Sequence, residues 1–139
     1  MNMDVKMLYN KGNHLIESGR FEEAIACFDK AIEIDGRDSI VWNLKGFALY
    51  GLGRFEEAIA CFDKAIEIDE GRDAGVWNNK GVALYELKRF EEAIACFDRA
   101  LKINPRDVKV WRNKGNALVE LGMLNEAVKC FSRAIEIDA

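Results

Sequence analysis

Four cysteines offer the most obvious chemistry in this sequence, because thiolates bind metals and pairs of thiols form disulfides. They are spaced by 34, 35 and 34 residues, at Cys27, Cys61, Cys96 and Cys130. If this spacing marks helical repeats, neighbouring cysteines would lie roughly 8–10 Å apart or more, beyond the Cα separation of about 7 Å that a disulfide tolerates. The spacing also differs from the CxxC pairs of metal sites. We therefore expect four reduced thiols that fill small apolar spaces, with no disulfide and no metal.

The remaining residues with catalytic potential are better explained by structure. His14 is the only histidine, and we expect it to be partly buried and hydrogen-bonded. Paired acidic residues such as Glu56 and Glu57 stand where helices are expected to begin, and negative charge suits that end of a helix. The sequence contains no phosphate-binding loop, serine elbow or dinucleotide fingerprint. It therefore predicts neither an enzyme nor a cofactor-binding protein.

The cysteines are positioned by a repeat that runs through the whole chain. Residues 19–35 read GRFEEAIACFDKAIEID, and residues 53–69 repeat these letters without a change. Related versions occupy residues 90–104 and 124–138. Because a period of 20 to 50 residues is typical of solenoids, the sequence predicts an all-α repeat array. We expect one domain over residues 1–139, with repeats at 5–38, 39–73, 74–107 and 108–139.

Each repeat is predicted to be a pair of helices. In the second repeat, apolar residues recur at three- and four-residue spacing on both sides of Gly53, which suits the left-handed residue at a helix end. Gly19 and Gly122 occupy the same place, whereas Lys88 replaces glycine there at a cost of about 1 kcal/mol. Four aspartates are expected to cap the first helix of each repeat, namely Asp4, Asp38, Asp73 and Asp107.

Composition narrows the possible partners and location. The chain has 139 residues, of which half are apolar and 32% are charged, as expected for a globular protein. Its net charge of −4 argues against nucleic acid or anionic membranes as partners. No segment approaches the roughly 20 apolar residues that span a bilayer, and the amino terminus lacks the apolar region of a secretory signal. We expect a cytoplasmic protein.

The residues that recur at fixed places resemble the tetratricopeptide-repeat family. Its pattern combines tryptophan, glycine, then alanine and phenylalanine, and it is matched in the second repeat by Trp42, Gly46, Ala58, Phe62 and Ala65. The resemblance covers residues 5–139, although lysine stands in the usual leucine position and leucine in the usual tyrosine position. It implies a right-handed superhelix in which the first helices line a groove that receives peptide segments of partner proteins.

The face of each first helix opposite its apolar stripe would line this groove. Asparagine carboxamides there could bond a peptide backbone, aromatic residues could form apolar pockets, and two cations could meet an acidic group. The predicted groove residues are Tyr9, Asn13, Asn43, Phe47, Tyr50, Asn78, Val82, Tyr85, Lys109, Arg112 and Asn116.

One specific ligand is disfavoured within this family. Members that grip the acidic tails of heat-shock chaperones use a clamp of Lys and Asn, then Asn, then Lys and Arg on three successive first helices. The corresponding residues of repeats one to three are Tyr9, Asn13, Leu44, Gly75 and Asn79. Those of repeats two to four are Asn43, Phe47, Asn79, Lys109 and Asn113. Because most clamp positions are not matched, we expect weak or no binding to such tails.

Two other functions remain open at this stage. Solenoids normally end in a polar capping helix, and none follows the fourth repeat here. Apolar surface around Val128, Phe131 and Ile135 would then be uncovered. This predicts either that the chain is part of a longer protein or that it self-associates through the last repeat. RNA binding, known for other helical repeats, is a weaker alternative because the sequence has no basic stripe.

Overall fold

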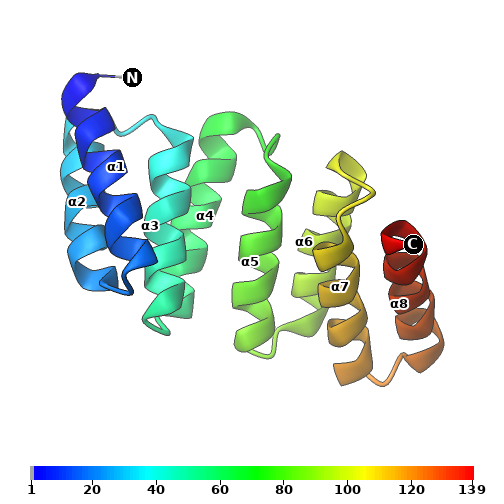
Figure 1. Cartoon of the computed structure of the whole chain (residues 1–139). Helices are drawn as coiled ribbons and strands as arrows, with labels where there is room; N and C mark the ends of the chain where they lie inside the picture. The colour runs from blue at the N-terminus through cyan, green and yellow to red at the C-terminus, as the bar shows by residue number, and fades with distance from the viewer. Residues whose placement is uncertain (1) are drawn as a thin grey trace. The chain divides into compact units, whose positions relative to one another are not determined.

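The computed structural model describes residues 2–139, and over these residues it consists of helices without a strand (Figure 1). Short turns join the helices in pairs, which confirms the predicted helix-turn-helix repeats. The helices are α1 (Met3–Glu17), α2 (Phe21–Ile34), α3 (Ser39–Gly51), α4 (Phe55–Asp69), α5 (Ala74–Glu86), α6 (Phe90–Ile103), α7 (Val108–Glu120) and α8 (Leu124–Asp138).

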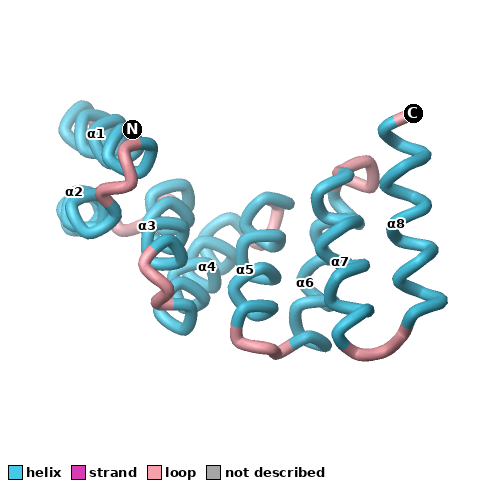
Figure 2. Tube along the Cα trace, turned by 60° about the horizontal axis from the view of Figure 1, so that its bottom comes forward, coloured by secondary structure: helices cyan, strands magenta, loops and turns pink. Residues whose placement is uncertain are grey.

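The chain divides into two compact units of two repeats each. Unit 1 comprises Met1–Gly71 and unit 2 comprises Arg72–Ala139. In unit 1, α2 packs against both α1 and α3, and α3 packs against α4 (Figures 1 and 2). In unit 2, α6 packs in the same way against α5 and α7, and α7 packs against α8. A single domain over residues 1–139 stays a prediction.

A phenylalanine packed against a glycine forms the centre of each repeat. The rings of Phe28, Phe62 and Phe97 are almost completely buried. A methyl group added at Gly46 would lie 2.6 Å from Cε1 of Phe62, and one added at Gly81 would lie 2.5 Å from Cε1 of Phe97. Such distances are too short for carbon atoms, so glycine is required for this close approach of the two helices.

Within each unit, tryptophan and lysine side chains connect the second repeat of the unit to the first. In unit 1, the indole Nε1 of Trp42 donates to the carbonyl oxygen of Gly36 at 2.9 Å. Lys45 lies 5.7 Å from the Trp42 ring centroid, and its Nζ is 2.7 Å from the carboxylate of Asp29 on α2. Unit 2 repeats this ion pair between Lys114 of α7 and Asp98 of α6, also at 2.7 Å. Lys45 and Lys114, two of the lysines that replace the family's leucine, therefore join neighbouring repeats within a unit.

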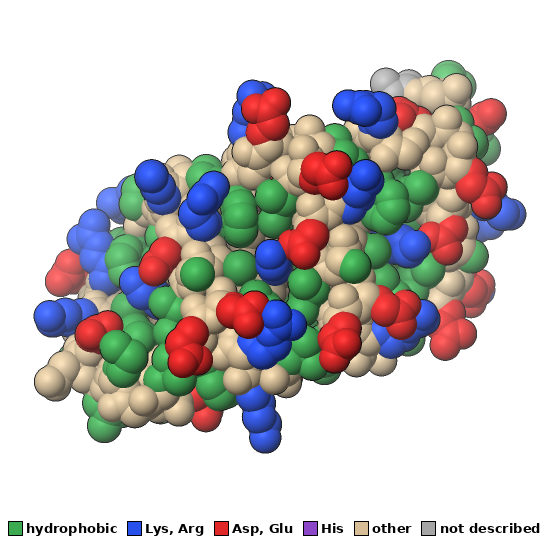
Figure 3. All heavy atoms as spheres, turned by 180° about the vertical axis from the view of Figure 1, so that it is seen from behind, with side chains coloured by type: hydrophobic (Ala, Val, Ile, Leu, Met, Phe, Trp, Pro, Cys, Tyr) green, Lys and Arg blue, Asp and Glu red, His purple; other side chains and the backbone are tan. Residues whose placement is uncertain are grey.

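Acidic residues in the first turns of the second helices pair with the arginine that precedes each helix. Glu57 accepts a hydrogen bond from Arg54 at 2.6 Å, and Glu92 accepts one from Arg89 at the same distance. The hydrogen bond from the adjacent arginine lowers the pKa of both carboxyl groups. On the face seen in Figure 3, acidic and basic side chains are likewise interspersed.

Three of the four predicted aspartate caps are confirmed. The carboxylates of Asp38, Asp73 and Asp107 accept hydrogen bonds from backbone N–H groups at the starts of α3, α5 and α7. The prediction for Asp4 is wrong, because Asp4 lies inside the first turn of α1. Asn2 caps this helix instead, accepting from the Asp4 N–H at 2.7 Å.

The structure shows what surrounds the cysteines and the histidine, the residue types with possible chemistry. All four cysteines are buried free thiols, and burial raises the pKa of Cys61 to about 11. Among the described residues, no group of three metal-ligating side chains is placed to hold an ion. His14 is exposed rather than partly buried, because no described helix covers this side of α1. The equivalent Ala48 of α3 is buried in an apolar cluster that includes residues of α2. No helix within residues 2–139 combines the length and the apolar run needed to cross a bilayer.

Lys88 adopts the left-handed conformation that glycine takes in the other repeats. Its φ is +62°, against +75° for Gly19 and +76° for both Gly53 and Gly122. Because a Cβ atom is strained there, we expect Lys88→Gly to raise the free energy of unfolding by about 1 kcal/mol. Urea denaturation followed by circular dichroism measures this. The reverse change, Gly122→Lys, is the matched control and should lower stability by a similar amount; an unchanged or less stable Lys88→Gly protein would contradict the argument.

Candidate functional site

Three predicted groove residues of unit 2 converge on one cleft. Val82 and Tyr85 of α5 and Asn116 of α7 line a space of about 210 Å³. Its wall is completed by Phe97 of α6 and Asn113 of α7, together with Glu86. We call this space the α5–α7 cleft. It combines an aromatic ring, an aliphatic side chain and carboxamides, which suits an apolar side chain with the backbone on either side of it.

The Tyr85 side chain is held in place at the edge of this cleft. Its ring meets the ring of Phe90 edge to face, with centroids 5.3 Å apart. Partial burial raises the pKa of the Tyr85 phenol, and the nearby Glu120 carboxylate raises it further. A tyrosine hydroxyl is protonated at neutral pH even at its ordinary pKa, so the Tyr85 hydroxyl is a hydrogen-bond donor at the cleft edge.

Asn78 does not lie on an open face, contrary to the prediction. It is only 7% exposed, and its carboxamide oxygen accepts a hydrogen bond of 3.0 Å from the side chain of Asn113. This bond joins α5 to α7, so Asn78 helps to set the spacing of two first helices. The sequence shows an asparagine at a groove position but does not show that a second asparagine on the next first helix will bond it.

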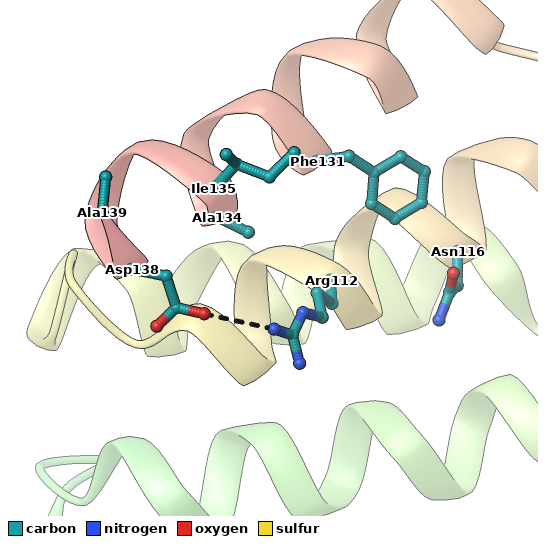
Figure 4. A pocket seen from close by; sticks show the side chains of 7 residues that line it. All are labelled: Arg112, Asn116, Phe131, Ala134, Ile135, Asp138 and Ala139. Carbon is teal, nitrogen blue, oxygen red and sulfur yellow. Dashed lines mark hydrogen bonds and ion pairs between the residues drawn. The ribbon is translucent and has the colours of Figure 1, made fainter.

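Two of the three predicted residues of α7, Arg112 and Asn116, also border a second cleft, which the sequence did not predict as a pocket. Arg112 and Asn116 project from α7, and Phe131 and Ile135 project from α8 (Figure 4). This end cleft measures about 570 Å³, and its lining is completed by Ala134, Asp138 and Ala139. Arg112 is largely exposed and reaches the Asp138 carboxylate at 3.3 Å. Lys109 is exposed on the same helix but does not line either cleft.

The predicted residues of unit 1 lie on α1 and α3. Phe47 is 42% exposed, which is a large exposed fraction for an aromatic side chain. Tyr9, Asn13 and Asn43 are half-buried. Tyr50 is also half-buried and meets the ring of Phe55 edge to face at 5.3 Å, in the same arrangement as Tyr85 and Phe90. The two units therefore present related faces built from equivalent residues.

Phe97 and Asn113 line the α5–α7 cleft but were not predicted to do so, because position in a helix assigns a residue to only one surface. Phe97 is equivalent to Phe62 and is buried in the core, yet it also forms part of the cleft wall. Asn113 follows Arg112 and was considered only as a clamp position. Its signal was the recurrence of asparagine at Asn79 and Asn113, one position after the predicted groove residue of each helix.

Comparison with known sequences gives a consistent family result. Profiles described as tetratricopeptide repeat match residues 4–70, 74–107 and 108–139. Together these matches cover nearly the whole chain. No curated protein matches the chain in sequence.

The chain is similar in fold to many solved structures. A crystal structure of MamA superposes with a TM-score of 0.91 at 22% identity, over 96% of this chain and 78% of MamA. The first tetratricopeptide-repeat domain of Spaghetti (RPAP3), bound to the HSP90 peptide SRMEEVD, superposes with a TM-score of 0.84 at 21% identity, over 88% of this chain and 96% of that one. At these identities the likeness concerns the fold.

Proposed function

Because the chain belongs to the tetratricopeptide-repeat family, we propose that it binds an extended segment of a partner protein along the face formed by α5 and α7. Proteins of this family are protein-interaction scaffolds rather than enzymes, and this chain is such a scaffold. The observation that carries the proposal for this face is the α5–α7 cleft, in which Val82, Tyr85 and Asn116 come together.

The cleft has the size and lining for one side chain of a partner. A volume of about 210 Å³ accommodates a residue of leucine to phenylalanine size, and the walls formed by Val82, Tyr85 and Phe97 favour an apolar one. Asn116 is exposed at the rim, where its carboxamide can both donate to and accept from a peptide backbone. A segment in extended conformation would present its backbone and alternate side chains to these groups.

The related face of unit 1 is proposed as a second contact for the same kind of ligand. Phe47 offers an exposed apolar surface on α3, and the half-buried Tyr9, Asn13, Asn43 and Tyr50 add polar and aromatic groups on α1 and α3.

We do not propose the HSP90 peptide bound by the Spaghetti domain as a ligand of this chain. That peptide contains acidic residues near its end, and binding it would call for cations at the clamp positions. Here those positions hold mostly uncharged residues, including Asn79 and Asn113. We therefore keep the expectation of weak or no binding to chaperone tails, and we propose a partner segment with an apolar anchor residue instead.

Peptide selection tests the proposal without a known partner. A displayed library of random peptides of about nine residues would be enriched on the intact chain, and the enriched peptides would be titrated against variants. Asn116→Ala removes backbone hydrogen bonds and Val82→Trp fills the cleft. Each should weaken binding about tenfold or more, since the loss of one anchor contact costs about 1.4 kcal/mol. Asn78→Ala is unsuitable because Asn78 bonds Asn113.

A matched control separates the cleft from general surface effects. Ile103→Ala alters an exposed apolar residue of α6 that lines neither cleft, and it should leave the peptide affinities unchanged. Circular dichroism would show that all variants keep the parent helicity. Enriched peptides that bind Asn116→Ala and Val82→Trp as tightly as the parent would refute the assignment of the α5–α7 cleft.

We also propose that the protein works in a reducing compartment such as the cytoplasm. The support is chemical: all four cysteines are free thiols in the apolar interior. Free buried cysteines of this kind are common where thiols are kept reduced.

A further inference from the structure

The residues that line the end cleft on α8 are equivalent to residues of α2 on which α3 packs. In unit 1, Val41 and Ala48 of α3 pack in one apolar cluster with Phe28 and Ala31 of α2. The residues of α8 equivalent to Phe28 and Ala31 are Phe131 and Ala134, and both line the end cleft. The part of α8 that corresponds to the α3-binding surface of α2 is therefore uncovered.

Exposed fractions show how much apolar surface this leaves. Ile135 of α8 is 71% exposed, whereas the equivalent Leu101 of α6, against which α7 packs, is only 7% exposed. In Figure 4, Ile135 and Phe131 project from α8 on the side of the cleft. An isoleucine exposed to this extent next to a cleft of about 570 Å³ is typical of an interaction surface.

The opposite half of the same contact is uncovered on α1. Met7 occupies the position of Val41, yet Met7 is 66% exposed while Val41 is fully buried. Met3, one turn earlier, is 77% exposed. The outer face of α1 is therefore the surface by which a first helix packs on the second helix of a preceding repeat.

We propose that a second copy of this chain covers the end cleft by placing its α1 on α8, in the way that α3 packs on α2. Met7 of one copy enters the cleft between Phe131 and Ile135 of the other. The cleft has room for Met7 and His14 in place of the smaller valine and alanine of α3. Asn116 lines both clefts, whereas Met7, Phe131 and Ile135 do not line the α5–α7 cleft.

Polar groups match in the same register. In unit 2, Asn78 of α5 and Asn113 of α7 form a hydrogen bond of 3.0 Å between two successive first helices. The equivalent positions across the proposed contact are Arg112 of one copy and Asn10 of the other, and both side chains are exposed. The guanidinium can donate to the carboxamide oxygen, so the two exposed polar groups become partners.

One ion pair of the internal contacts is missing from the proposed one. Lys45 pairs with Asp29 and Lys114 pairs with Asp98, but the residues in these places across the contact are Lys11 and Ser132. The contact between copies is therefore weaker than the contacts within a unit. Since it joins two different surfaces, it is heterologous, and successive copies can extend the chain.

Sedimentation over a range of concentrations tests this proposal. The parent chain should form dimers and larger species as its concentration rises. Met7→Glu and Ile135→Glu should each weaken association by at least about tenfold, because each buries a charge in the apolar contact. An equimolar mixture of the two variants retains one intact pair of surfaces and should form dimers that grow no further.

Two more variants test the register of the contact between copies and the effect of an added charge. Ser132→Asp restores the missing partner of Lys11 and should tighten association about two- to fivefold, as expected for an exposed ion pair. Ile103→Glu introduces the same charge on an exposed isoleucine of α6 and should associate as the parent does. A parent chain that stays monomeric at millimolar concentration, or variants whose mixture stays monomeric, would overturn the proposal. Association lost in Ile135→Glu but kept in Met7→Glu would also overturn it, since that result indicates symmetric pairing of two α8 helices.

Discussion

Replacing Phe97 by alanine is expected to lower the free energy of unfolding by about 3–5 kcal/mol. The ring is fully buried between α5, α6 and α7, and it packs directly on the backbone of Gly81. Its removal leaves a cavity that cannot close, because glycine has no side chain to move into it. Urea denaturation monitored by circular dichroism measures the loss, at protein concentrations low enough to keep the chain monomeric.

The same substitution at Phe131 provides the matched control. Phe131 occupies the equivalent place in the last repeat, but it is only partly buried and borders the end cleft. Part of its surface is therefore already in water, and we expect Phe131→Ala to cost about half as much. Equal losses at the two positions would show that burial of the ring by the following helix does not contribute to stability.

The fold was predictable from this sequence because each repeat carries its own signals. Gly53 takes the left-handed conformation and Asp38 caps α3, both as the repeated letters indicated. Every signal acts within one repeat or between neighbours, so periodicity was sufficient to find it. The resemblance to the tetratricopeptide-repeat family was confirmed for the same reason.

The candidate site was only partly predictable, because the ends of the array break the equivalence between repeats. His14 stands where other repeats have a buried alanine, yet it is exposed because no described helix covers that face. Asn78 was placed correctly on α5, but its bond to Asn113 depends on a residue of the next helix. Val82, Tyr85 and Asn116 were predicted individually, whereas the cleft they form depends on the distance between α5 and α7. The sequence period does not give that distance.

We also expect Gly81→Ala to lower the free energy of unfolding by about 1–2 kcal/mol. Alanine favours a helix over glycine by about 1 kcal/mol, so on helix propensity alone the change should stabilise α5. The new methyl group, however, would lie 2.5 Å from Cε1 of Phe97, a ring that is fully buried, unlike that of Phe131. Overpacking of this kind costs about 1–3 kcal/mol and more where the neighbours are rigid, so the steric effect should prevail. Urea denaturation again supplies the measurement.

A double-mutant cycle shows whether the ring is the cause of this loss. Phe97→Leu shortens the side chain that the methyl group would meet, so Gly81→Ala should cost at least about 1 kcal/mol less in the Phe97→Leu background. Gly115→Ala tests the same clash in the last repeat, where the methyl group would lie 2.6 Å from Cε1 of Phe131. Phe131 can turn toward the open end cleft, and this variant should therefore be close to the parent in stability. If Gly81→Ala and Gly115→Ala were equally harmful and neither coupled to its phenylalanine, the close approach of the helices would not depend on the glycine.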